Sequence, residues 1–358
     1  MSFIFYTDNP FTQPDRYHMI DTNLIIGSLG SGKTSCIQHL IEQIPDNEYW
    51  LIIVNEFGQI GIDAALLSEQ QSNNLNIREI SGGCICCAAQ SKLRVNLTQL
   101  IRDKRPDRIL IEATGLGHPA GIIDLLRDEY LKPVINISTI ITVVDISLFD
   151  QQPDSHDTGS PINTENFKQQ IQLADIIVLN KMDLATNSNQ THVRHFLKSF
   201  YPLKNKIIET MQGKIDSCHL SFDSAVDKKV PFSKVHTHYD HENQTFQLHD
   251  FSIQQFSSES ESHMSFGFIF PAEVTFSRKC LQNFFTTLLN NPSLQIERLK
   301  AVFNCGRNWY GFNAVGTDLN ISESFYRRDS RIEIISAKKN FDITDFRNRL
   351  FVEIKSAS

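Results

Sequence analysis

The sequence lacks the marks of a secreted or membrane-spanning protein. Its first residues, MSFIFYTDNPFTQPDRYH, have neither a basic start nor a sustained apolar stretch. No uninterrupted apolar run approaches the roughly 20 residues that a helix needs to cross a bilayer. We therefore expect neither a secretory signal nor a membrane partner.

An excess of positive charge is also missing. The 34 Lys and Arg residues are outnumbered by 41 Asp and Glu residues, which gives a net charge of -7 and argues against nucleic acid as the main partner. The sequence shows no internal repeat. At 358 residues and 41% hydrophobic composition, the chain is long enough for two globular domains.

A complete phosphate-binding loop is present near the N-terminus. The string GSLGSGKT follows the apolar run Leu24 to Ile26 and precedes the helix-like segment TSCIQHLIEQI. Its glycines let backbone N–H groups point at phosphate oxygens, Lys33 supplies a point charge, and Thr34 supplies a hydroxyl ligand for Mg²⁺. The predicted nucleotide-binding residues of this segment are Gly27, Gly30, Ser31, Gly32, Lys33, Thr34 and Ser35.

A second motif indicates which base is bound. The apolar stretch ADIIVLN runs into Asn180-Lys181-Met182-Asp183. Asp183 can accept hydrogen bonds from the ring N–H and the exocyclic amine of guanine, whereas adenine presents a mismatched edge. We expect GTP and GDP as ligands, with Asn180, Lys181 and Asp183 among the nucleotide-binding residues. A P-loop kinase is a weaker interpretation, because Asp183 disfavours it and no phosphoacceptor site is evident.

Between these motifs, the strand-like run in RILIEATG delivers a carboxylate and a glycine. Glu112 could hold the Mg²⁺ water shell or orient an attacking water, and Gly115 would let a backbone N–H approach the γ-phosphate. A further strand-like run, TIITVVD, ends at Asp145, which we interpret as a structural loop carboxylate.

Three thiols lie within four residues in Gly83-Cys84-Ile85-Cys86-Cys87. Such clustered thiolates suit a soft tetrahedral cation such as Zn²⁺, with at least one ligand from elsewhere. A redox C-x-x-C pair formed by Cys84 and Cys87, or simple packing of three small apolar groups, stays open as an alternative. Free clustered thiols and GTP together indicate the reducing cytoplasm. The remaining cysteines that stand singly, Cys218, Cys280 and Cys305, are expected to be packed rather than functional.

The motifs occur together and in one order. The phosphate loop is followed by Asn55-Glu56-Phe57-Gly58, Gly61-Ile62-Asp63, the cysteine run, Glu112-Ala113-Thr114-Gly115-Leu116 and the Asn180 motif. This set resembles the CobW-type family of metallochaperone GTPases, related to HypB and UreG, the accessory GTPases that mature hydrogenase and urease. The resemblance covers nearly the whole chain, because IERLKAVFNC and RIEIIS resemble the C-terminal domain of the family.

The resemblance implies a set of roles. Glu56, Cys86 and Cys87 match the internal metal ligands of the family, with Cys84 as a further thiolate. Asp63 matches a switch carboxylate, so that Lys33, Asp63 and Glu112 form the expected catalytic set and Thr34 the expected Mg²⁺ ligand. The chain departs from the commoner pattern at Gly117-His118-Pro119; His118 could be an extra ligand, and the interpretation we favour is a helix cap.

The function that follows is a GTPase that converts GTP and water to GDP and phosphate and carries Zn²⁺ to a client metalloprotein, with possible nucleotide- or metal-dependent homodimers. A cobalt-handling or enzyme-activator GTPase, and a redox-sensing switch without metal cargo, are the alternatives.

Strand-like runs that alternate with helical patterns predict an α/β fold, a doubly wound and mostly parallel sheet, followed by a smaller α+β domain. We expect an N-terminal extension at 1–18, the GTPase domain at 19–216, a linker with an edge strand at 217–262 and the C-terminal domain at 263–354. The linker carries His236, His238, His241 and His249, which either bind metal or belong to a solvated segment.

Overall fold

The computed structural model describes residues 19–54, 74–79, 87–113, 119–149, 162, 164–204, 206–221, 242–248, 251–259, 263–338 and 341–352. The chain divides into two compact units, one of residues 1–200 and 204–228 and the other of residues 201–203 and 229–358. Among the helices within these described ranges, none is long and apolar enough to cross a membrane.

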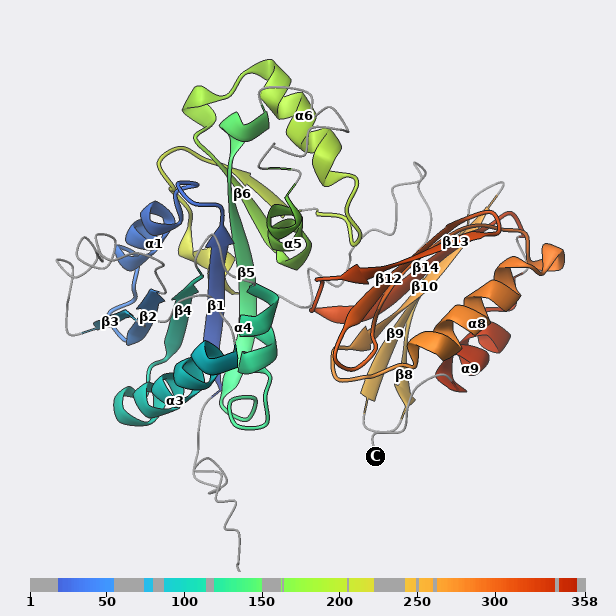
Figure 1. Cartoon of the computed structure of the whole chain (residues 1–358), viewed down its shortest axis with the longest axis horizontal. Helices are drawn as coiled ribbons and strands as arrows, with labels where there is room; N and C mark the ends of the chain where they lie inside the picture. The colour runs from blue at the N-terminus through green and yellow to red at the C-terminus, as the bar shows by residue number, and fades with distance from the viewer. Residues whose placement is uncertain are drawn as a thin grey trace, which may run out of the picture. The chain divides into compact units, whose positions relative to one another are not determined.

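The first unit is built on a seven-stranded sheet in the order β3-β2-β4-β1-β5-β6-β7, and all of its described pairings are parallel (Figure 1). The strands are β1 (Ile20–Gly27), β2 (Trp50–Val54), β3 (Leu75–Glu79), β4 (Arg108–Glu112), β5 (Ile135–Asp145), β6 (Ile176–Asn180) and β7 (Lys206–Glu209). The α-helices are α1 (Lys33–Ile41), α3 (Cys87–Lys104), α4 (Pro119–Leu126), α5 (Glu165–Leu173) and α6 (Asn187–Leu197). Short 3-10 turns are η1 (Ile146–Phe149), η3 (Met182–Leu184) and η4 (Ser217–Leu220).

The strands of this sheet are apolar because both of its faces are covered. Along β6, Ile176 and Val178 pack into the core that contains α1, while Ile177 and Leu179 pack into the core that contains α5 and α6. In Figure 1, α4 crosses in front of β5. In a parallel sheet, the helices that connect the strands cover both faces, so the strands are buried on each side. The predicted doubly wound α/β fold is confirmed.

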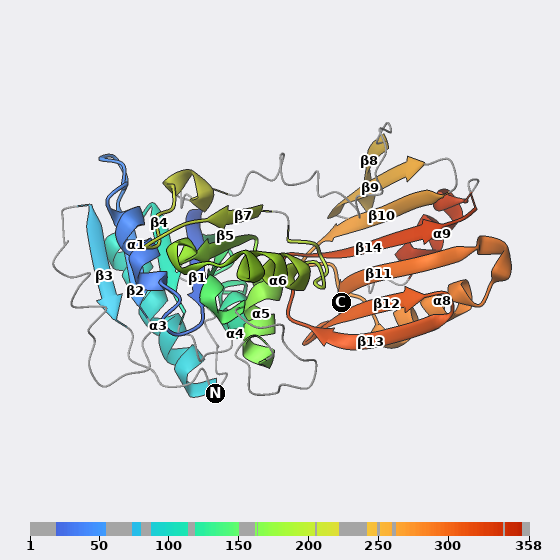
Figure 2. The same ribbon diagram turned by 90° about the horizontal axis from the view of Figure 1, so that it is seen from above.

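The second unit is a seven-stranded antiparallel sheet in the order β13-β12-β11-β14-β10-β9-β8. Its strands are β8 (Glu242–Leu248), β9 (Phe251–Glu259), β10 (Met264–Pro271), β11 (Ile296–Asn304), β12 (Trp309–Val315), β13 (Asp318–Ser324) and β14 (Asp329–Ser336). The helices α8 (Arg278–Leu289) and α9 (Ile343–Val352) lie on the same face of the sheet, and the short turn η5 (Pro292–Leu294) follows α8 (Figures 1 and 2).

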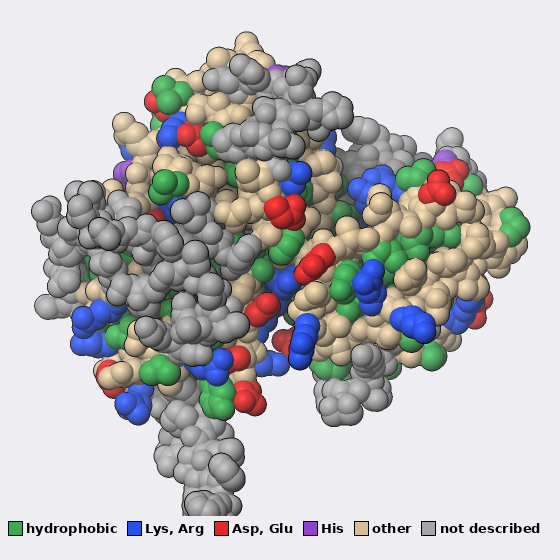
Figure 3. All heavy atoms as spheres, in the orientation of Figure 1, with side chains coloured by type: hydrophobic (Ala, Val, Ile, Leu, Met, Phe, Trp, Pro, Cys, Tyr) green, Lys and Arg blue, Asp and Glu red, His purple; other side chains and the backbone are tan. Residues whose placement is uncertain are grey.

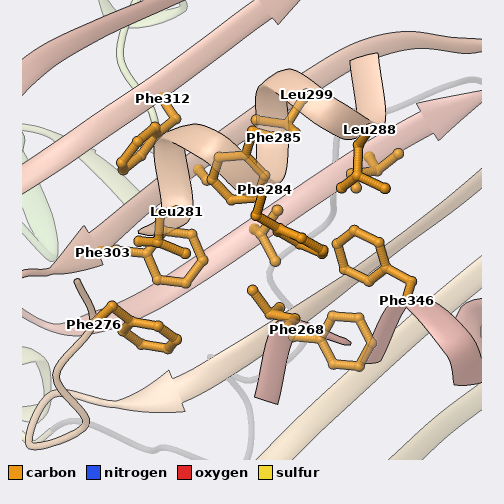
Figure 4. Packing of buried hydrophobic residues seen from close by; sticks show 14 of the residues in the cluster. Phe268, Phe276, Leu281, Phe284, Phe285, Leu288, Leu299, Phe303, Phe312 and Phe346 are labelled. Atoms are coloured by element: carbon orange, nitrogen blue, oxygen red, sulfur yellow. The ribbon is translucent and has the colours of Figure 1, made fainter. Parts of the chain in front are cut away.

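A phenylalanine-rich core holds the helices to this sheet (Figure 4). Phe268 of β10 stacks on Phe346 of α9 with 5.9 Å between the ring centroids, and Phe285 of α8 meets Phe312 of β12 edge-on at 5.2 Å. Each fully buried phenylalanine contributes about 1.5–3 kcal/mol relative to an exposed one. This unit therefore has a core of its own, as the predicted α+β domain requires.

More of the chain is regular than the sequence analysis expects. Both β8 and β9 lie within the 217–262 segment that was interpreted as a linker with one edge strand, and β13 was not predicted at all. The physical reason is composition, since these strands alternate Gln, Ser, Asn and Thr with few apolar residues, and only pairing with neighbours makes them strands.

Figure 3 shows that basic and acidic side chains are interspersed on the visible face of the described residues.

Candidate nucleotide site

The motif residues of the first unit meet at the carboxyl edge of its sheet. The central strand β1 ends at Gly27, and the registers pair Ile25 of β1 with Glu112 of β4 and Asp145 of β5 with Asn180 of β6. In open α/β sheets, ligands bind at this edge, where neighbouring crossovers leave to opposite faces. The fold therefore places the phosphate loop, Glu112 and the Asn180 motif side by side.

The phosphate loop ends in a left-handed residue that only glycine fits. Gly32 has φ 101° and caps α1, which begins at Lys33. A Cβ on Gly32 would lie 2.1 Å from the Nδ2 atom of Asn180, so the backbone conformation and the close approach both exclude a side chain. The loop is closed further by the N–H of Ser31, which donates to the carbonyl of Ser28 at 3.2 Å.

Lys33 is buried at the base of this loop, with 7% of its surface exposed. Its Nζ donates to the carbonyl oxygens of Gly27 at 3.1 Å and Ser28 at 2.9 Å. The bond to Gly27 joins Lys33, at the end of the loop, to the first residue of the loop. An ammonium held there, beside the N-terminus of α1, makes a concentrated positive site for phosphate oxygens.

Two predicted Mg²⁺ groups contact each other. The Oγ1 atom of Thr34 donates to the Oε1 atom of Glu112 at 3.2 Å, and Glu112 is only 5% exposed. A hydroxyl and a carboxylate next to the phosphate loop are hard oxygen donors, the type that Mg²⁺ prefers. The contact thus joins residues 78 positions apart into one cation-compatible pair.

Asn180 links the phosphate loop to a second loop that the sequence analysis missed. Its Nδ2 donates to the carbonyl of Ser31 at 2.9 Å, and its Oδ1 accepts from the N–H of Gly213 at 3.0 Å. Asn180 is 2% exposed, so the amide is a buried bridge. Gly213 has φ +73°, and a Cβ there would lie 2.7 Å from the backbone nitrogen of Cys36. The only sequence signal was a glycine shortly after the short strand β7.

The two other residues of the base motif are more exposed. Lys181 has φ 62° and its Nζ contacts the Oδ2 atom of Asp145 at 2.5 Å, while Ser147 donates to Oδ1 from its backbone at 3.0 Å and its hydroxyl at 2.7 Å. Burial alone would raise the pKa of Asp145, but the hydrogen bonds from Lys181 and Ser147 outweigh it and lower that pKa. Asp145 is thus an ionised partner that orients Lys181, in agreement with its structural interpretation. Asp183 lies exposed at η3.

Several predicted site residues fall outside the described residues. They are Glu56, Asp63, Cys84, Cys86, Gly115 and His118, together with the histidines at 236, 238, 241 and 249. Cys87 is the first residue of α3, and its side chain is likewise not described. Within the described ranges, no group of three His, Cys, Asp or Glu side chains lies close enough to hold a metal ion.

The cysteines that stand singly differ from one another. Cys36 is fully buried in α1 behind the phosphate loop, and burial, with the charge of Glu112, raises the pKa of its thiol to about 12. Cys305 packs partly against the core of the second unit. Cys218 and Cys280 are exposed, so the prediction that they pack is wrong. Both lie at polar surface positions whose exposure depends on the tertiary fold.

The family comparison decides the affiliation of the chain. Residues 21–207, more than half of the sequence, match the model described as CobW/HypB/UreG, nucleotide-binding domain. The chain belongs to the CobW/HypB/UreG family. The predicted membership of this family of P-loop nucleotide-binding proteins is therefore confirmed, and its matched domain spans every strand from β1 to the start of β7.

Relatives within the family extend the likeness over the second unit. Zinc chaperone YeiR of Escherichia coli (strain K12) is 33% identical over 327 residues, which is 90% of this chain and 94% of YeiR. Zinc-regulated GTPase metalloprotein activator 1 of Dictyostelium discoideum is 25% identical over 52% of this chain and 45% of its own. The crystal structure of Zn(II)-bound YjiA GTPase from E. coli covers 94% of this chain and 100% of that chain at 16% identity, with a TM-score of 0.43.

Proposed function

We propose that this protein hydrolyses GTP to GDP and phosphate in the cytoplasm, binds Zn²⁺ at its cysteine cluster and passes the ion to a client metalloprotein. The observation that carries the nucleotide part is the joined set of Lys33, the Thr34–Glu112 pair and the Asn180 bridge at one sheet edge. The names of the relatives, zinc chaperone YeiR and a zinc-regulated GTPase metalloprotein activator, support zinc and GTP as the ligands.

The residues present fit a magnesium nucleotide. Lys33 and the N–H groups of the loop would bind the β- and γ-phosphates. Ser35, in the first turn of α1, would also bind the nucleotide. Thr34 and Glu112 would hold Mg²⁺ directly or through water, and the bound ion would neutralise the negative charge that develops on the phosphates. Asp63 and Gly115 are proposed for the attacking water and the γ-phosphate.

Guanine selection would rest on Asp183, whose exposed carboxylate is free of the apolar core and could accept from both guanine donors. Lys181 carries an aliphatic stem that could cover one face of the base, held in place by Asp145. Asn180 would position the two loops beside the nucleotide rather than contact the base. Its Nδ2 donates to the backbone of Ser31 in one loop, and its Oδ1 accepts from the backbone of Gly213 in the other.

Strand pairing supports the position of the zinc ligands. Val54 is the last residue of β2, and its register partners are Glu79, the last residue of β3, and Glu112, the last residue of β4. The segment that follows β2 carries Glu56 and begins beside Glu112, and the segment that follows β3 carries Cys84 to Cys87 and begins one strand further out, beside the end of β2. A carboxylate with thiolates is a Zn²⁺-compatible ligand set.

This topology suggests how nucleotide and zinc could be coupled. Glu112 contacts Thr34 of the nucleotide site and pairs through its backbone with β2, whose next residues lead to Glu56. A nucleotide that repositions these strand-end segments would change the geometry of the zinc ligands. A change of 10² to 10³ in zinc affinity needs a coupling free energy of only about 3–4 kcal/mol.

The test is GTP turnover by the full chain with Mg²⁺, with and without one equivalent of Zn²⁺. We expect Zn²⁺ to change turnover in the wild type and not in the Cys86→Ala, Cys87→Ala variant. A matched control removes two thiols elsewhere, Cys280 and Cys305, and should respond as the wild type does. An equal zinc response in all three proteins would contradict the coupling, and turnover of ATP at the rate of GTP would contradict the guanine assignment.

A further inference from the structure

A cysteine and a histidine stand side by side on the surface of the first unit, outside the nucleotide site. They are Cys218 and His219 of the turn η4, which Asp216 caps by accepting from the N–H of Cys218 at 2.7 Å. The Sγ atom of Cys218 lies 3.8 Å from the Nδ1 atom of His219. Cys218 is exposed and His219 partly exposed, so both donors are open to a ligand from solution.

The turn that carries them is fixed to the body of the unit. Gln43, just after α1, donates to the carbonyl of Ile215 at 2.9 Å and accepts from the N–H of Ser217 at 2.8 Å. The carbonyl of Leu220 accepts three side-chain hydrogen bonds, from Asn23 at 2.7 Å, Ser138 at 2.8 Å and Thr139 at 3.2 Å. These bonds hold the backbone of η4 on both sides, so the two donors project from a fixed turn.

The spacing of the two donors suits a tetrahedral cation. With Zn–S near 2.3 Å and Zn–N near 2.0–2.1 Å, a sulfur and a nitrogen ligand in tetrahedral geometry lie about 3.6 Å apart. The observed 3.8 Å needs only a small side-chain adjustment. We propose that Cys218 and His219 form a second, open binding site for a soft divalent cation of the Zn²⁺ type.

Such a site would hold its ion loosely. No third His, Cys, Asp or Glu ligand completes a cluster here among the residues that the structure describes, so water or a donor from another molecule fills the remaining positions. The hydrogen bond to Asp216 raises the pKa of the Cys218 thiol, so an incoming cation must displace a proton. Both features lower affinity and favour fast exchange.

An open two-ligand site is suited to receiving or releasing an ion, because a partner can add its own ligands to the ion before the bonds to Cys218 and His219 break. The use of the site in zinc transfer rests on the proposed function, whereas its ability to bind a cation does not. Cys218 lies five residues after Gly213, so the site is on the segment whose start bonds to Asn180.

Co²⁺ absorption tests the site in the full chain. Cys84, Cys86 and Cys87 are first replaced by Ala, so that no signal arises from the cluster. We expect the thiolate-to-cobalt charge-transfer band to remain in this protein, to vanish on adding Cys218→Ser and to persist on adding Cys280→Ser, the matched exposed thiol. His219→Ala should weaken Co²⁺ binding at least about tenfold, since even residues that only support a ligand are worth about 10–100-fold.

Absence of the band, or a band that survives Cys218→Ser, overturns the proposal. A second measurement guards against misfolding of the multiple variant: in the otherwise wild-type chain, equilibrium dialysis against excess Zn²⁺ should show one bound zinc equivalent fewer for Cys218→Ser than for Cys280→Ser. Equal counts would also overturn it. Because neither readout uses GTP, failure of the GTPase proposal would leave these results unchanged.

Discussion

Gly213 offers a sharp test of how the second loop supports the nucleotide site. Its φ of +73° is costly for any residue with a side chain, and a Cβ would lie 2.7 Å from the nitrogen of Cys36 and 2.9 Å from the Cβ of Ser35. Gly30 has nearly the same φ, +74°, but nothing lies within 4 Å of an added Cβ. A comparison of the Gly213→Ala and Gly30→Ala variants therefore distinguishes the cost of backbone strain from the cost of steric conflict within one unit.

The expected costs differ by the steric part. Left-handed conformation costs about 1–2 kcal/mol for either Ala variant. At position 213 the added methyl also meets backbone atoms that cannot rotate away, and overpacking of this kind costs about 1–3 kcal/mol more. We expect Gly213→Ala to lower the free energy of unfolding by about 2–5 kcal/mol and Gly30→Ala by about 1–2 kcal/mol.

Urea unfolding followed by tryptophan fluorescence measures this difference. The chain has two tryptophans, Trp50 in β2 of the first unit and Trp309 in β12 of the second, so a Trp309→Phe background reports on the first unit alone. Gly213→Ala should also weaken binding of a fluorescent GDP analogue, because the loop that bonds Asn180 must move. Equal destabilisation by the two Ala variants would refute the steric argument.

Three further predictions concern buried groups of the first unit. Asn180→Asp replaces the donor to the carbonyl of Ser31 by an acceptor and should cost about 1–3 kcal/mol of unfolding free energy in the same assay; an unchanged urea midpoint would contradict the bridge. The pKa of Asp145 is lowered in the folded state from its ordinary value of 3.8. The difference in unfolding free energy between wild type and Asp145→Asn should therefore be constant above pH 3.8 and shrink as the pH falls through the pKa of the folded state. A difference that grows in acid would contradict the Lys181 pairing. Cys36, with its raised pKa and full burial, should react with a thiol reagent only as fast as the unit unfolds, which peptide mass analysis after timed labelling would show.

Much of the first unit was predictable because its strands are buried on both faces. The runs Ile176 to Leu179 and Ile109 to Ile111 are apolar throughout, and each is followed by the polar residue proposed for the site, Asn180 or Glu112. Local sequence therefore located the sheet edge. It could not show that Thr34 bonds Glu112, because that contact depends on the register between β1 and β4.

Other features arise only from tertiary contacts. The close approach that excludes a side chain at 213 comes from Ser35 and Cys36, far away in the sequence, and apart from the glycine itself nothing in the local stretch TMQG signals it. The sequence motif predicts that Asn180 binds the nucleotide, but it could not show that the amide bonds two loops, because the partners of a side chain are set by the fold. The polar strand β13 likewise becomes a strand through pairing with β12.

Nucleotide state is expected to change the zinc affinity of this protein. The direct measurement is zinc affinity of the full chain by chelator competition, once with a non-hydrolysable GTP analogue and Mg²⁺ and once with GDP and Mg²⁺. We expect zinc affinities that differ by about 10² to 10³-fold between the two nucleotide states, with the difference lost in the Cys86→Ala, Cys87→Ala variant. Equal affinities in the two nucleotide states would contradict it.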